Sequence, residues 1–371
     1  MGMPRREEAG PLWTLPSSFY TDPAILQREK EAIFYRSWLY AGHASRLKAP
    51  GSYLVFDMLD QSVIVLRGLD GVLRGFHNVC QHRAHRLLEG RGCTPVVTCP
   101  YHAWAYGLDG RLRTARGAEK LPGFDHAQFS LKPVAVEEFL CFVMVNLDAG
   151  AQPFARQMEG LADEMRREAP WLDTLVPVEA AAEEDRNGDI LKCNWKVLLE
   201  NCTECLHCTP SHPAFVDLVD LDTYRITTHA MHTTHTARAT KPANAAYAYP
   251  ADSAVRHVVF WHIWPNMTFG FMPGSHNFGA FCFEPVTATT TRARGDRLEL
   301  PGTPTASDVA RNRYGAEVLW IEDKGICESV QRGLASRGYD RGRIMVNDER
   351  HGASEHVVGF FQQKIREAIG A

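Results

Sequence analysis

The sequence predicts an α+β protein with two domains: an all-β domain comes first, and a domain with an antiparallel sheet flanked by helices follows. The chain has 371 residues and 45% hydrophobic residues, which is enough for two separate cores. Short apolar runs bounded by glycines and turns begin at Gly51. Beyond residue 190, amphipathic helical patterns alternate with strand-like runs. We predict three segments. Residues 1–40 form a helical start that packs with the second domain, residues 41–150 form the all-β domain, and residues 151–371 form the second domain.

The first of these elements follow from local patterns. A charged, helix-favouring run from Gln27 to Glu31 predicts a helix within residues 20–40. Leu140–Val145 has the apolar, β-branched composition of a strand that closes the all-β domain. Residues 150–185 are rich in Glu, Arg and Ala, and we interpret them as a helical connector.

Composition restricts the class of protein. A net charge of −4 and a pI near 6.5 leave no basic face for nucleic acid, so we expect no nucleic-acid partner. The start of the chain lacks the apolar segment of a signal peptide, and no run of about eighteen apolar residues occurs. We therefore expect a cytoplasmic protein without a membrane anchor. Its ten cysteines are expected to be reduced thiols and metal ligands, not a disulfide framework.

Two short motifs in the all-β region each carry one cysteine and one histidine. Cys80 and His82 form the first motif, and Cys99 and His102 form the second. A tetrahedral zinc site is one possible occupant of such a donor set. A Rieske cluster is the other, because it binds one iron through two cysteines and the other iron through two histidines. Zinc motifs usually pair like donors within one half, so one Cys and one His in each half favour the Rieske cluster.

A second constellation begins in the predicted helix from Asn194 to His207. Its apolar face holds Trp195, Leu198, Leu199, Cys202, Cys205 and Leu206. Its polar face, which includes His207, could simply be solvated. Pro210 then ends the helix and could turn His212 back toward His207. Two neutral imidazoles and one carboxylate form the facial triad of non-haem iron enzymes, so a buried acid would complete the site.

Asp323 is the candidate acid. The chain from about Asp308 to Leu334 is predicted to form one long helix, and Asp323 lies within its apolar stripe. A carboxylate in an apolar face costs several kcal/mol unless it is paired or binds a cation. A metal ion would satisfy it, and a buried salt bridge to an Arg or Lys is the alternative.

From about residue 20 to its end, the chain resembles the α subunits of Rieske non-haem iron oxygenases. The likeness lies in Cys80-Gln81-His82-Arg83, in Cys99-Pro100-Tyr101-His102-Ala103-Trp104, in the Asn-Trp-Lys helix and in the late Asp323. It implies one Rieske 2Fe-2S cluster and one mononuclear Fe(II). The implied iron ligands are His207, His212 and Asp323, and the implied cluster ligands are Cys80, His82, Cys99 and His102. Ala84 and Ala103 stand where many relatives carry glycine.

The resemblance also implies an electron path and an assembly. Glu204 and Asn201 would be catalytic, with Glu204 linking the iron to His102 of a neighbouring subunit in a homotrimer. No flavin or nicotinamide fingerprint is present, so a separate reductase of the flavin and ferredoxin type is expected to donate electrons. The implied reaction activates dioxygen and hydroxylates a small substrate. A Rieske electron carrier without catalysis is the remote alternative, because a carrier would not need the second constellation.

The substrate class is the least determined feature. Glu204-Cys205-Leu206-His207-Cys208 is closest to the branch that acts on betaines, choline and carnitine, although Leu206 departs from its frequent tyrosine. Oxidative N-demethylation or hydroxylation of such a quaternary ammonium compound is our first interpretation. Mono- or dioxygenation of an aromatic or other apolar substrate is the alternative. A quaternary ammonium is recognised by aromatic faces. The candidate pocket residues are Trp261, Trp264, Phe271, Phe281 and Trp320.

Two further patterns have simpler explanations. Cys202, Cys205 and Cys208 have the spacing of a cluster loop, but they lie in a helical pattern and are interpreted as small buried residues. The histidines at positions 229, 232 and 235 repeat every three residues, yet no neighbouring acid or cysteine completes a site. We interpret that stretch as a solvated segment or loop.

Overall fold

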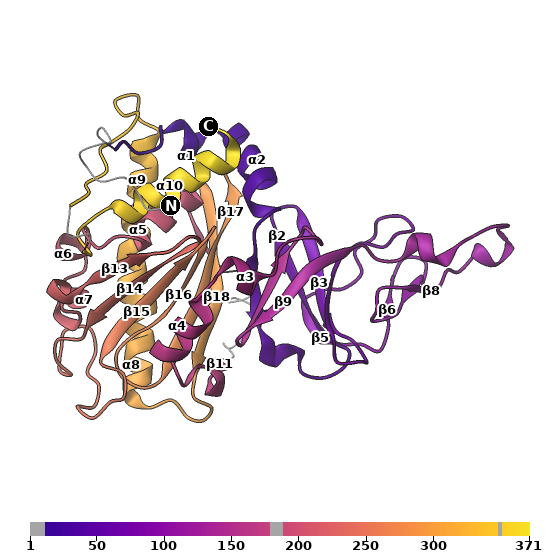
Figure 1. Cartoon of the computed structure of the whole chain (residues 1–371), viewed down its shortest axis with the longest axis horizontal. Coiled ribbons are helices and arrows are strands. Elements are labelled where there is room, and N and C mark those ends of the chain that lie inside the picture. The colour runs from indigo at the N-terminus through magenta and orange to yellow at the C-terminus, as the bar shows by residue number, and fades with distance from the viewer. Residues whose placement is uncertain (1–11, 179–187, 348–350) are drawn as a thin grey trace. The chain divides into compact units, whose positions relative to one another are not determined.

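The computed structural model describes residues 12–178, 188–347 and 351–371, and the chain divides into two compact units. One unit is Tyr35–Glu159, and the other combines Met1–Phe34 with Gly160–Ala371 (Figure 1). None of the helices in the described ranges has both the length and the apolar character that a bilayer span requires.

The Tyr35–Glu159 unit is built on an antiparallel sheet of seven strands in the order β1-β10-β9-β4-β3-β2-β5. A second sheet of three short strands, β6-β7-β8, carries the second Cys/His motif between β6 and β7. The predicted closing strand is confirmed as β10 at Phe142–Asn146, paired with β9 and β1. The other strands are β1 Leu39–His43, β2 Ser52–Met58, β3 Gln61–Arg67, β4 Leu73–His77, β5 Arg91–Cys93, β6 Val97–Thr98, β7 Ala105–Tyr106, β8 Leu112–Thr114 and β9 Pro133–Phe139.

The second unit is organised around a larger antiparallel sheet in the order β11-β18-β17-β16-β15-β14-β13, with β12 pairing with β18. The predicted antiparallel sheet is confirmed, because three of its strands pair in the expected succession. The strands are β11 Val176–Pro177, β12 Asp189–Leu191, β13 Arg225–Thr228, β14 His232–Arg238, β15 His257–Ile263, β16 Met267–Phe271, β17 Asn277–Thr287 and β18 Thr290–Glu299.

Helices cover both faces of this sheet (Figure 1). Helix α4 lies on one face, and α5, α8 and α9 lie on the other. The helix predicted within 20–40 is confirmed. The connector predicted over 150–185 is helical as far as residue 174, β11 follows it, and 179–185 lies outside the described residues. The helices are α1 Ser18–Thr21, α2 Pro23–Glu29, α3 Phe154–Gln157, α4 Leu161–Glu168, α5 Trp195–Cys202, α6 Cys208–Ser211, α7 Pro213–Leu218, α8 Ala306–Tyr314, α9 Trp320–Leu334 and α10 His356–Ile369.

Helix α5 is anchored by its first three residues. Asn194 caps the helix by accepting the Lys196 backbone N–H at 3.0 Å. Trp195 Nε1 and Lys196 Nζ both donate to Glu29 of α2, at 2.8 and 2.6 Å, and the Glu29 and Lys196 side chains are fully buried. Because removing one partner of a buried ion pair leaves the other charge uncompensated, this contact fixes α5 against α2.

The helix predicted to run as far as His207 ends earlier, at Cys202. Thr203 is the C-cap, and the following turn is tied to a distant segment by the Cys205 N–H, which donates to Gly352 O at 2.8 Å. Pro210 does not end a helix either, since it lies inside the short helix α6. A helical projection assumes uninterrupted periodicity, so it cannot predict the contact between Cys205 and Gly352.

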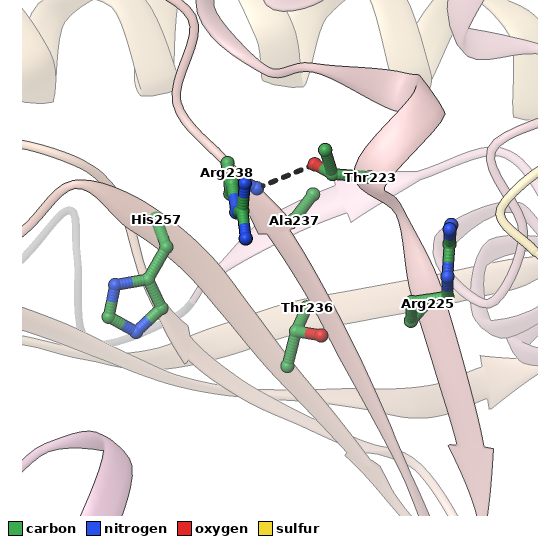
Figure 2. Close-up of a pocket in the computed structure, with 6 residues that line it drawn as sticks. All are labelled: Thr223, Arg225, Thr236, Ala237, Arg238 and His257. Atoms are coloured by element: carbon green, nitrogen blue, oxygen red, sulfur yellow. Dashed lines mark hydrogen bonds between the residues drawn. The ribbon is translucent and has the colours of Figure 1, made fainter.

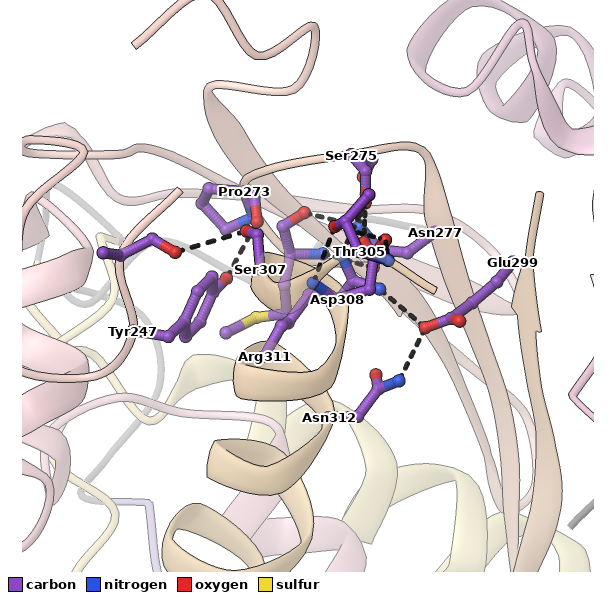
Figure 3. A network of polar contacts seen from close by, with 12 residues as sticks. Tyr247, Pro273, Ser275, Asn277, Glu299, Thr305, Ser307, Asp308, Arg311 and Asn312 are labelled. Carbon is purple, nitrogen blue, oxygen red and sulfur yellow. Dashed lines mark hydrogen bonds and ion pairs between the residues drawn. The ribbon is translucent and has the colours of Figure 1, made fainter. Parts of the chain in front are cut away.

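The long helix predicted from Asp308 to Leu334 is present, but a π-helical turn at Gly315–Leu319 separates α8 from α9. Cys327 and Leu334 of the predicted stripe are buried in α9, whereas Val330 is exposed. The start of α8 is fixed by a capping box and by Arg311, which binds Asp308 and Glu299 at 2.9 and 2.7 Å (Figure 3).

Candidate metal centres

The two Cys/His loops of the Tyr35–Glu159 unit have the same backbone path. In each loop the cysteine carbonyl accepts the N–H of the alanine four residues later, Ala84 or Ala103, at 3.0 Å. In each loop the cysteine N–H donates to the carbonyl five residues later at 2.8 Å. Ala84 and Ala103 both have φ +56°, a left-handed conformation that favours glycine. The alanines therefore occupy positions where the turn would accept glycine with less strain.

The four predicted cluster ligands separate into a buried pair and an outer pair. The thiols of Cys80 and Cys99 are 2% exposed and belong to an apolar core. The His82 and His102 rings lie 4.7 Å apart on the more exposed side of the loops, and His82 stacks on Trp104. Two thiols inside and two imidazoles outside match a binuclear cluster with one iron for each kind of donor. The donor set therefore fits a Rieske cluster better than a single zinc ion.

Hydrogen bonds to the cysteine sulfurs complete this environment. The Tyr106 hydroxyl lies 3.3 Å from Cys80 Sγ and accepts the Gln81 N–H at 3.0 Å. Burial raises the pKa of the Cys99 thiol, and the backbone N–H groups of Tyr101 and His102 partly offset this. Such donors would stabilise thiolate ligands and tune the reduction potential of a cluster.

In the second unit, the turn after α5 and helix α9 bring His207, His212 and Asp323 together. One potential ligand atom from each of the three lies within 4.8 Å of the others. Asp323 Oδ1 is 3.1 Å from His212 Nε2 and 3.7 Å from His207 Nε2. The two rings meet edge to face at 5.1 Å. Two imidazoles and one carboxylate in this arrangement are the donor set of a mononuclear non-haem iron site.

Three polar side chains hold these groups in position. Glu204 Oε1 binds His207 Nδ1 at 2.5 Å, and Glu322 Oε2 binds His212 Nδ1 at 2.8 Å. Each imidazole thus presents its Nε2 toward Asp323. Asn201 Nδ2 donates to Asp323 Oδ1 at 2.6 Å, so Asn201 is a positioning residue. Glu322 was not among the predicted site residues, because its helical projection placed it outside the apolar stripe.

The pKa values of His207 and Asp323 reflect an excess of negative charge in this cluster. Burial lowers the pKa of His207, but Asp323 and Glu204 outweigh it and raise that pKa to about 9. Burial raises the pKa of Asp323, but His207, His212 and Asn201 lower it to about 2. Three carboxylates, counting Glu322, therefore face two imidazoles and attract protons to them. A divalent cation among the Nε2 and Oδ1 atoms would supply the missing positive charge.

The five predicted pocket aromatics do not converge on this cluster. Strand alternation places Trp261 and Phe271 on one face of the sheet, where they contact Phe278 and Trp171. Ala237 and Val258, which pack with Cys205 and Cys208 beside His207, project from the opposite face. Trp261 and Phe271 therefore lie on the sheet face opposite Ala237 and Val258, and their predicted role in a substrate pocket stays a prediction.

The other three predicted aromatics have separate surroundings. Phe281 is 37% exposed on β17, and Trp264 stacks on Phe361 of α10. Trp320 donates its Nε1 to Asp189 at 2.8 Å. These positions give the three side chains no shared cavity, because they belong to different edges and layers of the unit.

Tyrosines, which the sequence reasoning did not select, lie nearer to the cluster. Tyr247, Tyr249 and Tyr314 share an apolar core with Cys205 and Cys208. Tyr247 is 6.1 Å from Tyr249 and 5.9 Å from Tyr314 between ring centroids. The Tyr314 hydroxyl is buried and has no hydrogen-bond partner among the described residues. Burial raises the pKa of Tyr314, and the charges of Glu322 and Asp323 raise it further.

A cavity of about 560 Å³ lies elsewhere in the same unit (Figure 2). Arg225, Arg238 and His257 give it a basic lining, together with Thr223, Thr236 and Ala237. It contains none of the three clustered ligands, so its position does not identify the place where a substrate would meet the metal.

Two other sequence interpretations are corrected. Cys205 and Cys208 form a disulfide, because the turn around His207 brings their Cα atoms to 4.9 Å. The stretch with His229, His232 and His235 is not a solvated loop. His232 and His235 are buried in β14, and Glu164 of α4 supplies an acid beside His229 and His232.

Comparison with known proteins agrees with this geometry. The Rieske [2Fe-2S] domain family matches residues 37–125, and the catalytic domain of the ring-hydroxylating α subunit matches residues 166–371. A Rieske domain followed by this catalytic domain defines an iron-dependent oxygenase, an oxidoreductase with one 2Fe-2S cluster and one mononuclear iron. The chain belongs to the family of ring-hydroxylating oxygenase α subunits.

Several members of the family are similar over nearly the whole chain. The carnitine monooxygenase oxygenase subunit of Acinetobacter baumannii is 37% identical over 356 residues, which cover 95% of this chain and 94% of that protein. The chloroplastic choline monooxygenase of Beta vulgaris is 28% identical, and the matched residues cover 91% of this chain and 74% of that protein.

Solved structures give the same result. A quaternary ammonium Rieske monooxygenase in complex with its substrate L-carnitine superposes with a TM-score of 0.85 at 34% identity, covering 99% of both chains. Naphthalene 1,2-dioxygenase with bound indole has a TM-score of 0.78 at 19% identity and covers 97% of this chain and 92% of that chain. This second likeness shows the shared fold.

Proposed function

We propose that this chain is the oxygenase component of a monooxygenase that hydroxylates a small quaternary ammonium compound of the carnitine or betaine type. One observation carries the proposal: 37% identity to a carnitine monooxygenase oxygenase subunit over 95% of the chain. The structural likeness to the L-carnitine complex supports it independently. A pure electron carrier would not need the His207, His212 and Asp323 cluster.

The proposed cofactor ligands are the residues that the structure groups together. Cys80, His82, Cys99 and His102 would hold the Rieske cluster, and His207, His212 and Asp323 would hold the mononuclear iron. When bound, the two groups supply electrons and activate dioxygen for insertion into a C–H bond. The chain has no evident means of collecting electrons from a pyridine nucleotide, so a separate reductase of the flavin and ferredoxin type would act as donor. We place this system in the cytoplasm.

The chain's own residues position the reaction. Glu204 and Glu322 hold the His207 and His212 rings by their Nδ1 atoms, and Asn201 fixes the Asp323 carboxylate. These contacts keep the ligand atoms directed toward one point before a metal or substrate arrives, which reduces reorganisation during the reaction. In a homotrimer, Glu204 would also reach His102 of a neighbouring subunit and join the two metal centres.

Cation recognition is proposed to involve the tyrosine group rather than the predicted tryptophans. Tyr247, Tyr249 and Tyr314 lie within one core beside the cluster. Aromatic faces attract a quaternary ammonium, which cannot donate a hydrogen bond, by about 2 kcal/mol or more when desolvated. The nearby carboxylates Glu322 and Asp323 add negative potential that would favour the same charge.

The position of hydroxylation determines the product. Hydroxylation of an N-methyl carbon gives an unstable carbinolamine that releases formaldehyde and a tertiary amine. Hydroxylation of the adjacent carbon in the longer substituent instead releases trimethylamine and a larger aldehyde. The test is to assay the reconstituted enzyme with carnitine, γ-butyrobetaine, glycine betaine, choline and a panel of aromatic acids.

We expect dioxygen consumption coupled to formaldehyde or trimethylamine release with at least one quaternary ammonium compound, and no coupled product from the aromatic acids. Coupled hydroxylation of an aromatic acid, with neither amine nor formaldehyde from any quaternary compound, would contradict the proposal and support the aromatic-substrate alternative.

The proposed electron path is tested by two matched carboxylate changes. Glu204→Gln and Glu322→Gln each alter the carboxylate that binds one imidazole of the same cluster. We expect Glu322→Gln to lower iron affinity by about 10- to 100-fold, the usual cost of losing an outer-sphere partner. Glu204→Gln loses the same kind of contact to His207, but it is expected to stop turnover even when cluster and iron sites are filled.

Iron quantitation, single-turnover reoxidation of the Rieske cluster and steady-state rates would be measured for both variants. If Glu204→Gln retains coupled activity at saturating iron, electrons take another route. If both variants lose activity only through iron loss, Glu204 is a positioning residue alone.

A further inference from the structure

A second group of metal-binding side chains lies in the hairpin between β13 and β14. His229 and His232 flank its two-residue turn, and the His229 N–H donates to His232 O at 2.9 Å. Residues directly opposite each other in a hairpin project to the same side of the sheet. The two imidazole rings accordingly stack at 4.2 Å with an interplanar angle of 10°. The hairpin thus holds two imidazoles at a fixed spacing.

Helix α4 adds a carboxylate to this pair. Glu164 Oε2 lies 3.5 Å from His232 Nε2 and 3.8 Å from His229 Nε2. One potential ligand atom from each of the three residues lies within 4.8 Å of the others. The side chains of His232 and Glu164 are 2% and 14% exposed, and that of His229 is 35% exposed, so the group is partly buried with one side open to solvent.

The Nε2 atoms of this group are unsatisfied. Both are buried, and neither has a hydrogen-bond partner among the residues that the structure describes. The distances to Glu164 lie within ion-pair range but are longer than an ordinary hydrogen bond. They are close to the roughly 3.3 Å that separates two ligands of a tetrahedral ion with bonds of about 2.0–2.1 Å. A buried polar nitrogen without a partner is costly, and a cation placed between the three atoms would satisfy both.

We propose that Glu164, His229 and His232 form a second metal site, which takes a zinc-type divalent transition-metal ion. Two imidazoles and one carboxylate with a water molecule on the open side complete four-coordinate zinc. The ion would tie α4 to the tip of the β13–β14 hairpin, on the sheet face opposite the His207, His212 and Asp323 cluster. It is a structural site, separate from the oxygenase iron.

Glu164 is also within ion-pair distance of both imidazoles, at 3.5 and 3.8 Å, so a protonated histidine paired with Glu164 is the competing arrangement. Zinc titration separates the two arrangements, because an ion pair alone takes up no metal.

The test uses the full chain carrying Asp323→Ala, which weakens metal binding at the oxygenase site and leaves the second group intact. Zn²⁺ alone is titrated into this protein by calorimetry, with the Rieske absorbance monitored to confirm an intact cluster. We expect one zinc ion per chain at the second group. Adding His229→Ala should weaken that binding by at least about 100-fold, because the effect of a direct ligand exceeds the 10- to 100-fold typical of outer-sphere partners.

His257→Ala is the matched control. His257 has the same 35% exposure and lies 3.5 Å from Glu168 on the same helix α4, but it faces this carboxylate without a second imidazole. Zinc affinity should change less than about 2-fold in this variant, as expected when no ligand is lost. Hydrogen exchange of α4 and the hairpin should slow on zinc addition only where His229 is present.

The proposal is overturned if the Asp323→Ala protein and its His229→Ala derivative bind zinc equally, or if neither binds it. An equal loss of affinity in the His257→Ala control would overturn it as well, since that residue is not a ligand of the proposed site.

Discussion

The two faces of the large sheet carry two clusters with the same donors, and they differ in how firmly those donors are held. Around Asp323, each imidazole is bound through its Nδ1 by a glutamate, and the aspartate is held by Asn201. Around Glu164, the two imidazoles are set by hairpin pairing and by stacking on each other. The first cluster therefore has three carboxylates for two imidazoles, whereas the second has one.

The comparison shows that a donor set does not by itself define a catalytic centre. Outer carboxylates fix the ring orientations and raise the basicity of the ligands, and both effects matter for an ion that must change its coordination during a reaction. An ion that only joins a helix to a hairpin needs two imidazoles in fixed positions and one carboxylate. The helices that carry the first cluster are accordingly anchored by buried polar contacts, such as those of Glu29 and Arg311.

The largest expected effect separates the two clusters directly. Asp323→Asn should lower turnover at least about 1000-fold, since losing a charged ligand exceeds the 10- to 100-fold cost of losing an outer-sphere partner. Glu164→Gln should leave kcat and KM within about 2-fold, because its cluster does not contact the reaction. Steady-state kinetics with a reductase and iron quantitation check both. A comparable loss in Glu164→Gln would show that the second cluster serves catalysis.

A smaller effect should appear in the pH dependence of stability. Burial raises the pKa of Glu200 on α5 from its ordinary 4.5 to about 7, although hydrogen bonds from Tyr20 and Gln362 oppose this. The folded state then holds the proton more tightly than the unfolded chain. This contribution to stability is fully present below about pH 4.5 and is lost as pH rises through about 7, by up to about 3 kcal/mol.

Denaturant unfolding of the metal-free protein at pH 5 and pH 8 measures this contribution together with that of His207, whose pKa is raised to about 9, so Glu200→Gln should reduce the difference without abolishing it. Glu164 behaves in the opposite sense. Its lowered pKa means that its contribution is present above its ordinary pKa of 4.5 and is lost as pH falls. An unchanged pH slope in Glu200→Gln would show that another group near α5 titrates.

The smallest effect concerns the aromatic surroundings, which distinguish the first cluster from the second. Tyr314→Leu should raise KM for a quaternary ammonium substrate by about 10- to 30-fold, in line with a desolvated cation–π contact of about 2 kcal/mol. Tyr314→Phe keeps the ring face and should change KM less than about 3-fold. Equal KM values for the two variants would place the cation elsewhere. Iron content should match wild type in both.

Local sequence patterns were sufficient to predict metal ligands where the ligands lie in one short segment. The two Cys/His loops could be predicted because a few residues of tight turn determine which side chains project together. The fold class followed from strand and helix periodicity, which reflects one buried face for each element. His207 and His212 were also found locally, on either side of a short turn.

Only the tertiary structure decided which distant groups join these segments. Glu164 meets His229 and His232 because α4 packs on one face of the sheet, and no sequence spacing reveals that contact. Glu322 binds His212 because α9 packs beside the turn that follows α5, a contact between segments about 110 residues apart. Trp261 and Phe271 lie on the face of the sheet opposite Ala237 and Val258 because side chains alternate along their strands.

The same distinction accounts for the two metal clusters. The sequence by itself determined the Cys80–His82 and Cys99–His102 pairs and the His207–His212 pair, since covalent spacing limits where their side chains can go. The sequence also named Asp323, from its place in an apolar helical stripe. The packing of helices on a sheet decided that Asp323 meets one pair of imidazoles and Glu164 the other, because burial of apolar faces is non-directional.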